Sequence, residues 1–265
     1  MTDDQHFLFD LQGFLVIEDV LTQDEIDAAN AAIDENIHLV RHPEPTLSKG
    51  CENLVGTTGR GSFTQNPLSF DKPWCDPFRH MLTHPAAVDI LNEILGPGFR
   101  YDHAQMLIRM FKGTEGHFLH GATTRDPCQF HRFMHGRVQC GLCVAAWQLT
   151  ECKQGDGGFA FIRGSHKLNY RAPRKVLSME DDLGVVEQLV CKPGALVIFN
   201  EALIHGALPW TTDERERRSI LFKMSPGFLA YGPPAECMIQ DPTEDELALF
   251  APPSRTNRPT IGISE

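Results

Sequence analysis

The first hundred residues carry one strand pattern and two helical patterns. Gly13–Glu18 is an apolar run of the kind that forms a strand. Thr22 and Glu25 have the spacing of a capping box and predict a helix that runs from there to about His38. Inside this span, apolar residues recur at helical spacing, at Ile26, Ala29, Ile33 and Ile37. We therefore expect a strand followed by a helix with one apolar face.

A long polar stretch separates this helix from the next. Residues 41–80 are rich in Gly, Pro, Ser and Thr and show little periodicity, which predicts a long loop that could cover a pocket. Thr83 is expected to start the second helix, because Pro85 stands in its first turn and Gly96 stands just past its end.

The pattern changes to short strands after Gly98. Apolar and β-branched segments alternate there with breaks rich in Gly and Pro, as in sandwiches and barrels. We expect strands in Phe99–Phe111, Val138–Gln148, Gly158–Ile162, Val185–Val190, Ala195–Phe199 and Ser219–Met224. A last helix is expected at Glu244–Phe250. The fold class predicted is mainly β with flanking helices (α+β), in which helices pack outside a jelly-roll barrel.

These patterns predict a single domain over residues 1–265. Barrels of this size are common as one domain, and the 42% hydrophobic content is enough for a sizeable core. Residues 1–98 would form a helical flank with a lid loop, residues 99–226 the β core, and residues 227–265 a C-terminal extension.

The charge of the chain narrows the classes of partner. Asp+Glu is 35 and Lys+Arg is 24, so the net charge is −11. Nucleic acids and anionic membranes bind basic faces, so neither is expected as a partner. A small-molecule substrate, even an acidic one, is compatible with this net charge, because the local charge at a binding site can be opposite in sign to the net charge of the protein. No pattern indicates an oligomeric state.

The cellular setting expected from the sequence is the cytoplasm. No apolar run reaches about 18 residues, so no membrane span is expected. The N-terminus, MTDDQHFLFD, begins with acids rather than the basic residues of a signal peptide. Cysteines in this setting are expected to be reduced.

Cys140 and Cys143 form a lone CxxC motif. A zinc site would normally show a second pair or matching histidines. The two cysteines stand in an apolar run typical of a strand, where residues i and i+3 point to opposite faces. We expect buried, structural thiols.

The segment 200–226 carries the strongest candidate chemistry. His205 ends an apolar run, and about a dozen residues later Arg217 and Arg218 open another. A neutral imidazole can hold a divalent metal, and a guanidinium can hold a carboxylate in bidentate fashion. This spacing suits an iron enzyme with a 2-oxo acid cosubstrate, which chelates the metal at one end and presents a carboxylate at the other.

The earlier metal ligand is less clear. A non-haem iron site usually takes two histidines and one carboxylate, with one histidine and the acid two residues apart on a strand. Five histidines ahead of the barrel centre lack such an acid: His103, His117, His120, His131 and His135. The chain has one His-x-acid, His42-Pro43-Glu44, and we interpret it as a surface feature of the N-terminal loop.

His120 is the preferred early ligand, and His131 is its main rival. His120 follows a strand pattern, and Ala122 then takes the place of the carboxylate. A small residue there leaves a coordination position to which an exogenous anion such as chloride, or water, could bind. Alternatively, Asp126 could swing in from the adjacent loop.

Three ordered motifs resemble the phytanoyl-CoA dioxygenase (PhyH)-like family of Fe(II)/2-oxoglutarate-dependent oxygenases. They are GFLVIEDVLTQDEI, AAWQLTECKQGDGGFAFIRGSHK, and ALVIFNEALIHGALPW followed by RRSILFKMSPG. The resemblance covers most of the chain. It implies a double-stranded β-helix (a jelly-roll, cupin-like barrel), with Fe(II), 2-oxoglutarate and O2 as cofactors. The activity it implies is oxidation of an unactivated C–H bond in a small molecule.

The resemblance also implies roles for individual residues. His205 corresponds to the late iron ligand, and Arg217 to the arginine that clamps the far carboxylate of 2-oxoglutarate. Arg218 is the alternative clamp, because strand alternation lets one of the pair face the pocket. Trp147 matches a tryptophan near the cosubstrate.

Two departures from the family pattern matter. Arg163 replaces the proline of Pro-Gly-Ser-His-Lys, which we interpret as a turn variant. The missing His-x-Asp, with Ala122 in the acid position, resembles the 2-oxoglutarate-dependent halogenases, in which chloride takes the vacant site. Three hypotheses follow: a halogenase, an ordinary hydroxylase whose third ligand is Asp126, water or another residue, and a non-catalytic binding or sensing barrel.

Overall fold

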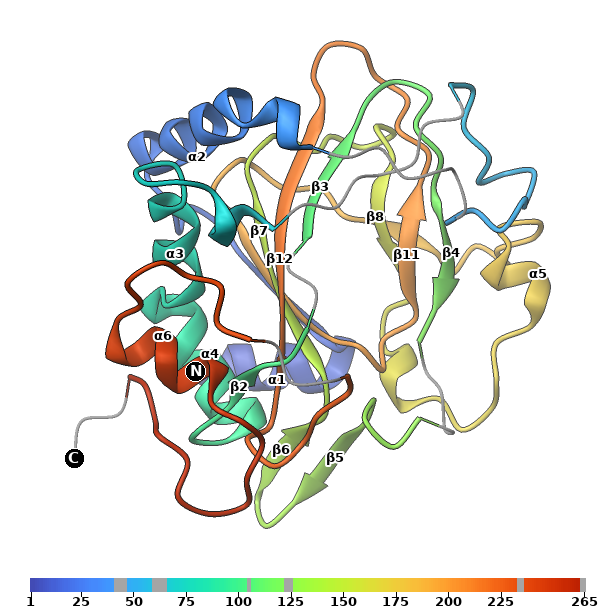
Figure 1. The fold of residues 1–265 in the computed structure, drawn as a ribbon. Coiled ribbons are helices and arrows are strands. Elements are labelled where there is room, and N and C mark those ends of the chain that lie inside the picture. The colour runs from blue at the N-terminus through green and yellow to red at the C-terminus, as the bar shows by residue number, and fades with distance from the viewer. Residues whose placement is uncertain (41–46, 59–65, 104–105, 122–125, 233–235, 263–265) are drawn as a thin grey trace.

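Two antiparallel sheets face each other, and helices cover the outer side of the larger one (Figure 1). The structure is a computed structural model that describes residues 1–40, 47–58, 66–103, 106–121, 126–232 and 236–262. The fold class predicted from the sequence is confirmed. Within the described residues, the jelly roll consists of two facing open sheets rather than one continuously closed barrel.

In the part of the chain that the structure describes, the larger sheet has six strands and the smaller sheet has four. In spatial order the larger sheet contains β1 (Phe14–Ile17), β10 (Leu196–Asn200), β7 (Cys143–Gln148), β12 (Arg217–Ser225) and β2 (Arg100–Tyr101), and β3 (Met106–Met110) also pairs with β12. The smaller sheet contains β4 (His117–His120), β11 (His205–Leu208), β8 (Gly158–Phe161) and β9 (Glu187–Gln188). A separate hairpin is formed by β5 (His131–Met134) and β6 (Arg137–Cys140).

Most of the helices lie against the larger sheet. They are α1 (Asp3–Gln12), α2 (Gln23–Glu35), α3 (Asp76–Leu82), α4 (Pro85–Leu95) and α6 (Glu244–Phe250). Figure 1 shows α2, α3, α4 and α6 on one side of that sheet, whereas the short helix α5 (Arg174–Leu177) lies beside β4. Within the described residues, no helix combines the length and the apolar character needed to cross a bilayer.

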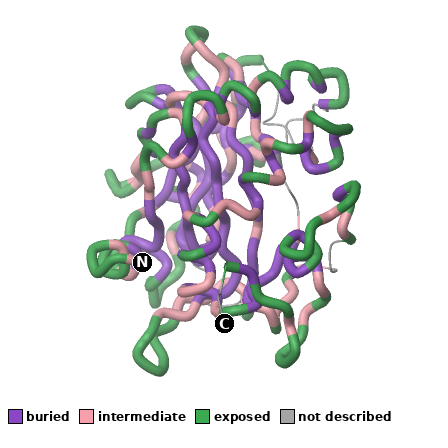
Figure 2. The backbone as a smooth tube through the Cα atoms, turned by 90° about the vertical axis from the view of Figure 1, so that its left-hand side faces the viewer, coloured by how far each residue is buried: buried purple, intermediate pink, exposed green. Residues whose placement is uncertain are grey.

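Strand alternation divides the buried side chains into two clusters. On β7, Ala145 and Trp147 pack toward the helices, whereas Val144 and Ala146 pack between the sheets. β12 follows the same rule, so that Phe222 belongs to the helix-side cluster and its neighbours on the strand face the other sheet. Figure 2 shows these buried strands at the centre of the molecule, with exposed loops around them.

Several elements match the sequence predictions. Thr22 caps α2 through the expected capping box with Glu25. The predicted last helix coincides with α6. The second predicted helix, α4, begins at Pro85, two residues after Thr83, because the ring of His84 accepts the capping hydrogen bond from the Ala86 N–H.

Other elements were not predicted. Helix α1 begins with a capping box formed by Thr2 and Gln5. Helix α3 begins inside the stretch 41–80 that was interpreted as a loop and ends two residues beyond it. Residues 41–46 and 59–65 of this stretch lie outside the described residues. Strand β1 belongs to the expected helical flank but pairs with β10, so the flank contributes directly to the larger sheet.

The CxxC motif differs from its prediction. Cys140 ends β6 and Cys143 begins β7, so the two cysteines flank a bend rather than alternating along one strand. Gly141 makes this bend possible, because a Cβ on it would lie 1.9 Å from the carbonyl oxygen of Cys128.

Candidate functional site

A β-bulge in β4 brings two histidines into the space between the sheets. His205 of β11 lies opposite His120, and two residues later Ala207 lies opposite His117, three residues back on β4. Strand β4 therefore carries one extra residue. Residues three apart normally point to opposite faces, but the bulge turns both β4 rings to the same side, with centroids 4.6 Å apart. The site thus contains three neighbouring imidazoles.

The turn between β10 and β11 adds a carboxylate. The Asn200 side chain accepts a hydrogen bond from the Ala202 N–H at 2.7 Å, and the Leu203 N–H donates to the Asn200 carbonyl at 2.8 Å. This turn places Glu201 and His205, four residues apart, on the same side, with exposed fractions of 2% and 6%. Burying a carboxylate has a large free-energy cost unless a cation neutralises it.

His120, Glu201 and His205 form a candidate metal site. One ligand atom of each lies within 4.8 Å of the others. The rings of His120 and His205 have centroids 4.3 Å apart, and Glu201 Oε2 lies 3.7 Å from His205 Nε2. Gly121 is required beside them, because its φ is +114° and a Cβ there would lie 2.1 Å from the Leu203 carbonyl oxygen.

Backbone carbonyls fix the tautomers of the two histidines. Nδ1 of His120 lies 3.2 Å from the carbonyl oxygen of Phe118, and Nδ1 of His205 lies 2.8 Å from that of Leu203. A carbonyl can only accept, so each Nδ1 carries the proton and each Nε2 keeps a lone pair. Burial lowers the pKa of both histidines and favours the neutral form. Two neutral imidazoles and one carboxylate form the donor set of a non-haem iron site.

The carboxylate of Glu201 is ionised, and its two oxygens face different partners, a histidine and a lysine. Its Oε1 lies 2.9 Å from Nζ of Lys223, whereas Oε2 faces His205. Burial alone would raise the pKa of Glu201, but His205 and Lys223 outweigh burial and lower it to about 2. The ammonium thus holds one carboxylate oxygen and leaves the other for a metal.

The cluster opens into a cavity of about 80 Å³. A second cationic side chain, in addition to Lys223, lines this cavity. Arg217 lines this cavity with an exposed fraction of 4%, and its Nη1 contacts the sulfur of Met110 at 3.3 Å. Within the described residues, no carboxylate forms an ion pair with Arg217. Burial lowers its pKa, yet an arginine stays charged in proteins. A buried guanidinium without an acidic partner is suited to bind an anionic ligand.

Arg218 points away from the cavity. It pairs with Glu216 and with Asp34 of α2, on the helix side of β12. Strand alternation therefore separates the two arginines, and Arg217 is the one that faces the histidines.

Trp147 does not fit the role of a cofactor-binding residue, and that prediction is corrected. Its side chain is fully buried in the helix-side cluster, 5.2 Å from the ring of His84, because odd-numbered residues of β7 face away from the cavity. His131, the rival early ligand, lies 3.0 Å from Asp10 in the hairpin region instead.

Two residues, Asp126 and Ala122, entered the alternatives for the third ligand. Within the described residues, Asp126 is outside the metal cluster, and its Oδ1 accepts a hydrogen bond from the Cys128 N–H at 2.8 Å. Ala122, on which the vacant-site hypothesis rests, lies outside the described residues.

Two residues of the site, Glu201 and Lys223, were not predicted from the sequence, whereas His117 was one of the five candidate histidines and was not the preferred one. Glu201 precedes His205 by four positions, whereas a carboxylate was expected two residues after an early histidine or at Asp126. The position of Lys223 could have identified it as a site residue, because it lies six residues after Arg217 and therefore on the same face of the predicted strand.

Lys223→Met is expected to destabilise the metal-free protein by about 3 kcal/mol, because removal of one partner leaves a buried, unpaired charge. The same change in a Glu201→Gln background should have a much smaller effect. Chemical unfolding of the four metal-free proteins gives the coupling energy. Equal effects of Lys223→Met in the two backgrounds would show that the pair does not interact.

Solved structures show the same fold. HygX from Streptomyces hygroscopicus with nickel and 2-oxoglutarate bound is 21% identical, with 87% of this chain and 89% of that chain covered and a TM-score of 0.67. The HygX structure that also contains hygromycin B gives the same identity and coverage and a TM-score of 0.69. EctD from S. alaskensis with 2-oxoglutarate and 5-hydroxyectoine is 19% identical, with 85% of this chain and 76% of that chain covered and a TM-score of 0.60.

A search of curated proteins gave no match. The family described as phytanoyl-CoA dioxygenase (PhyH) matches residues 9–219, which is most of the chain and includes Arg217 and the three residues of the candidate metal site. The resemblance seen in the sequence motifs is thereby confirmed. The chain belongs to the phytanoyl-CoA dioxygenase (PhyH) family.

Proposed function

We propose that this protein is an Fe(II)/2-oxoglutarate-dependent oxygenase that hydroxylates an unactivated C–H bond of a small molecule. The observation that carries the proposal is that His120, Glu201 and His205 converge in the wall of a cavity that Arg217 also lines, and no carboxylate among the described residues pairs with this arginine. When bound, Fe(II) and 2-oxoglutarate supply the oxidation of the C–H bond by O2, with release of CO2 and succinate.

The residues of the chain bind and orient these groups. Nε2 of His120, Nε2 of His205 and Oε2 of Glu201 would hold the metal, because these atoms are free of protons and face one another. Arg217 would bind the far carboxylate of 2-oxoglutarate through its guanidinium. Apolar side chains of the lining exclude water from these charges, and they include Phe159, Phe199 and Leu221.

Glu201 favours hydroxylation over halogenation. The halogenase hypothesis needs a site without a protein carboxylate, so that chloride can take the third position. Here a buried, ionised carboxylate lies beside both histidines, which supplies the negative charge that chloride would otherwise bring. This carboxylate, together with Arg217, also argues against a non-catalytic barrel, since a binding domain has no need to keep an iron ligand set and an anion clamp side by side.

A small-molecule substrate fits the fold neighbours. HygX was solved with hygromycin B and EctD with 5-hydroxyectoine, both small molecules. We place the substrate of this protein in the same broad class. The segment 47–58 would help to cover it, because its backbone contacts β4 through the bond from the Phe118 N–H to the Leu47 carbonyl, at 2.8 Å.

Anaerobic visible absorption of the purified protein with Fe(II) and 2-oxoglutarate tests the proposal. We expect a metal-to-ligand charge-transfer band, because bidentate chelation places an electron-accepting keto group on a ferrous ion. Titration with chloride should leave this band unchanged, since Glu201 already fills the third position. Absence of the band would contradict the proposed function, whereas a saturable shift with chloride would favour halogenation instead.

A further inference from the structure

A second cluster of reactive side chains lies outside the metal site, where α1 meets the β5–β6 hairpin. His131 Nε2 lies 3.0 Å from Asp10 Oδ1, and its Nδ1 lies 3.7 Å from Sγ of Cys140. Asp10 is also paired with Lys167 at 2.7 Å. A carboxylate, an imidazole and a thiol are therefore arranged in series, and the carboxylate fixes the tautomer so that the imidazole can accept the thiol proton.

The arrangement favours the thiolate of Cys140. Burial alone would raise the pKa of this thiol, but hydrogen bonds with Cys143 and His131 outweigh burial and lower it. The pKa of Cys143 is raised by burial and by the neighbouring Cys140, so Cys143 stays protonated. One thiol of the pair is thus activated as a nucleophile, whereas the other, three residues along the chain, stays protonated and can react in a second step.

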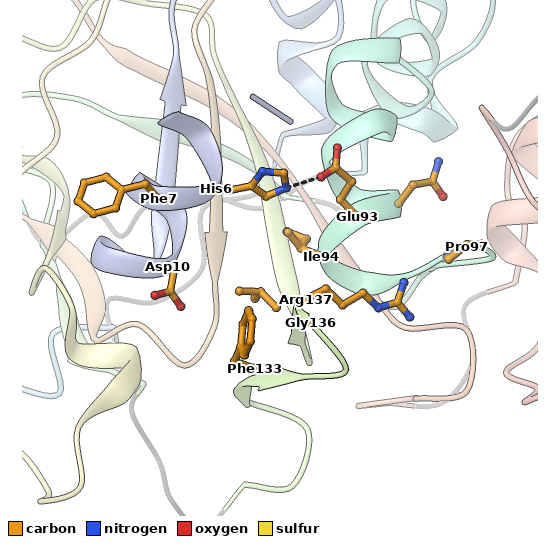
Figure 3. Close-up of a pocket in the computed structure, with 11 residues that line it drawn as sticks. His6, Phe7, Asp10, Glu93, Ile94, Pro97, Phe133, Gly136 and Arg137 are labelled. Atoms are coloured by element: carbon orange, nitrogen blue, oxygen red, sulfur yellow. Dashed lines mark hydrogen bonds and ion pairs between the residues drawn. The ribbon is translucent and has the colours of Figure 1, made fainter. Parts of the chain in front are cut away.

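Two pockets adjoin this cluster. Asp10 lies in the wall of a pocket of about 600 Å³ between α1, α4 and the hairpin, together with Phe133 and Arg137 (Figure 3). Cys140 lines a smaller cavity of about 60 Å³ that shares Arg137 and Val138 with the larger pocket. The thiol is buried, and the two pockets adjoin each other on the side of Cys140 that faces α4 and the hairpin.

We propose that Cys140 and Cys143 are a peroxide-sensitive thiol pair whose oxidation to a disulfide weakens the metal site. In the first step His131 takes the proton of Cys140, and the thiolate attacks one oxygen of hydrogen peroxide. The O–O bond breaks, the other oxygen leaves as hydroxide and takes a proton to become water, and Cys140 becomes a sulfenic acid. The thiol of Cys143 then attacks this sulfur, the S–O bond breaks, and a second water leaves as the disulfide forms. One peroxide is reduced to two waters, and two thiols are oxidised.

Oxidation is coupled to the metal site through the backbone between the two cysteines. The Glu201 N–H donates to the carbonyl of Leu142 at 2.9 Å. Leu142 is held on its other side, because its N–H donates to the Cys128 carbonyl at 2.8 Å. We infer that closing a disulfide across Gly141 and Leu142 reorients these peptide groups, so that Glu201 moves with the carbonyl that its N–H binds. This coupling rests on the proposed role of Glu201 as a metal ligand, whereas the thiol chemistry does not.

The thiol chemistry is tested on metal-free protein, so that iron does not convert peroxide into other oxidants. The protein is treated with hydrogen peroxide, quenched with catalase, alkylated and mapped by peptide mass spectrometry. We expect a disulfide between Cys140 and Cys143, about 2 Da lighter than the two thiols. In Cys143→Ser, Cys140 should instead be trapped as a sulfenic acid by dimedone. His131→Asn should slow both reactions at least about tenfold.

Two results would overturn the thiol proposal. One is that Cys140 and Cys143 stay reduced while the partly exposed Cys51 and Cys237 oxidise, which would show that the pair is structural. The other is that His131→Asn has no effect on the rate, which would show that the Asp10–His131 arrangement does not activate the thiol. Because no metal is present, neither result depends on the oxygenase proposal.

The coupling is tested by Mn(II) binding to the same samples, because Mn(II) prefers oxygen and nitrogen ligands to thiols. Free Mn(II) measured by electron paramagnetic resonance should show at least about tenfold weaker binding after oxidation, with recovery on reduction by dithiothreitol. Cys140→Ser should show no change with peroxide. Unchanged affinity in disulfide-linked wild-type protein would overturn the coupling, and absence of Mn(II) binding by reduced protein would instead contradict the proposed function.

Discussion

Glu201→Gln is expected to lower Fe(II)-dependent turnover and metal affinity by about 100-fold or more. Loss of an outer-sphere partner of a metal ligand already reduces affinity 10- to 100-fold, and this change removes the anionic ligand itself. Glutamine has nearly the same shape, so packing is preserved while the negative charge is lost. The neutral amide also leaves Lys223, which lies 2.9 Å from Glu201 Oε1, without its partner and close to the incoming cation.

Asp126 supplies the matched control for this prediction. It is the carboxylate that the sequence offered as third ligand, and it lies outside the metal cluster, where it caps a turn through the Cys128 N–H. Asp126→Asn should keep Mn(II) affinity within about threefold of the wild type. If Asp126→Asn loses the metal and Glu201→Gln retains it, the assignment of the third ligand is wrong.

Arg217→Met is expected to raise the KM for 2-oxoglutarate about 100-fold, with a smaller effect on metal affinity. Removing one partner of a buried charge pair costs roughly 2–5 kcal/mol, and 100-fold corresponds to about 2.7 kcal/mol. Methionine keeps much of the aliphatic volume, so the change reports the loss of the guanidinium. The measurement is succinate formation as a function of 2-oxoglutarate concentration at saturating iron.

Arg218→Met controls for the neighbouring arginine. Arg218 binds Glu216 and Asp34 on the helix side of β12, so its loss should lower stability by about 1 kcal/mol and leave the KM for 2-oxoglutarate nearly unchanged. Equal increases in KM for the two variants would contradict the separation of their roles.

Much of the fold could be predicted from local patterns. The capping box of Thr22 and the last helix were visible because helix ends depend on residues three or four apart. Strands β4 and β11 carry the two histidines of the candidate metal site. They were not predicted, because each has four residues and mixes histidine with apolar side chains. Their structure depends on pairing between segments about 85 residues apart, which no local pattern encodes.

The candidate site was also predicted only in part, because some of its residues come together through contacts between distant segments. His120 and His205 could be proposed from spacing, and strand alternation correctly required one of the two arginines to turn away. Glu201 could not be recognised as a partner of His120, because that contact depends on the turn after β10 and the bulge in β4. For Trp147, a motif match suggested a position near the cosubstrate. Its place on β7 instead puts its side chain on the helix side of the sheet.

The most direct test of the central claim is a crystal structure of the protein with Mn(II) and 2-oxoglutarate, with the metal located by anomalous scattering. We predict an anomalous peak within bonding distance of Nε2 of His120, Nε2 of His205 and a carboxylate oxygen of Glu201, with the far carboxylate of 2-oxoglutarate on Arg217. A metal that binds the two histidines while chloride or water fills the third position, and Glu201 stays on Lys223 alone, would contradict the account.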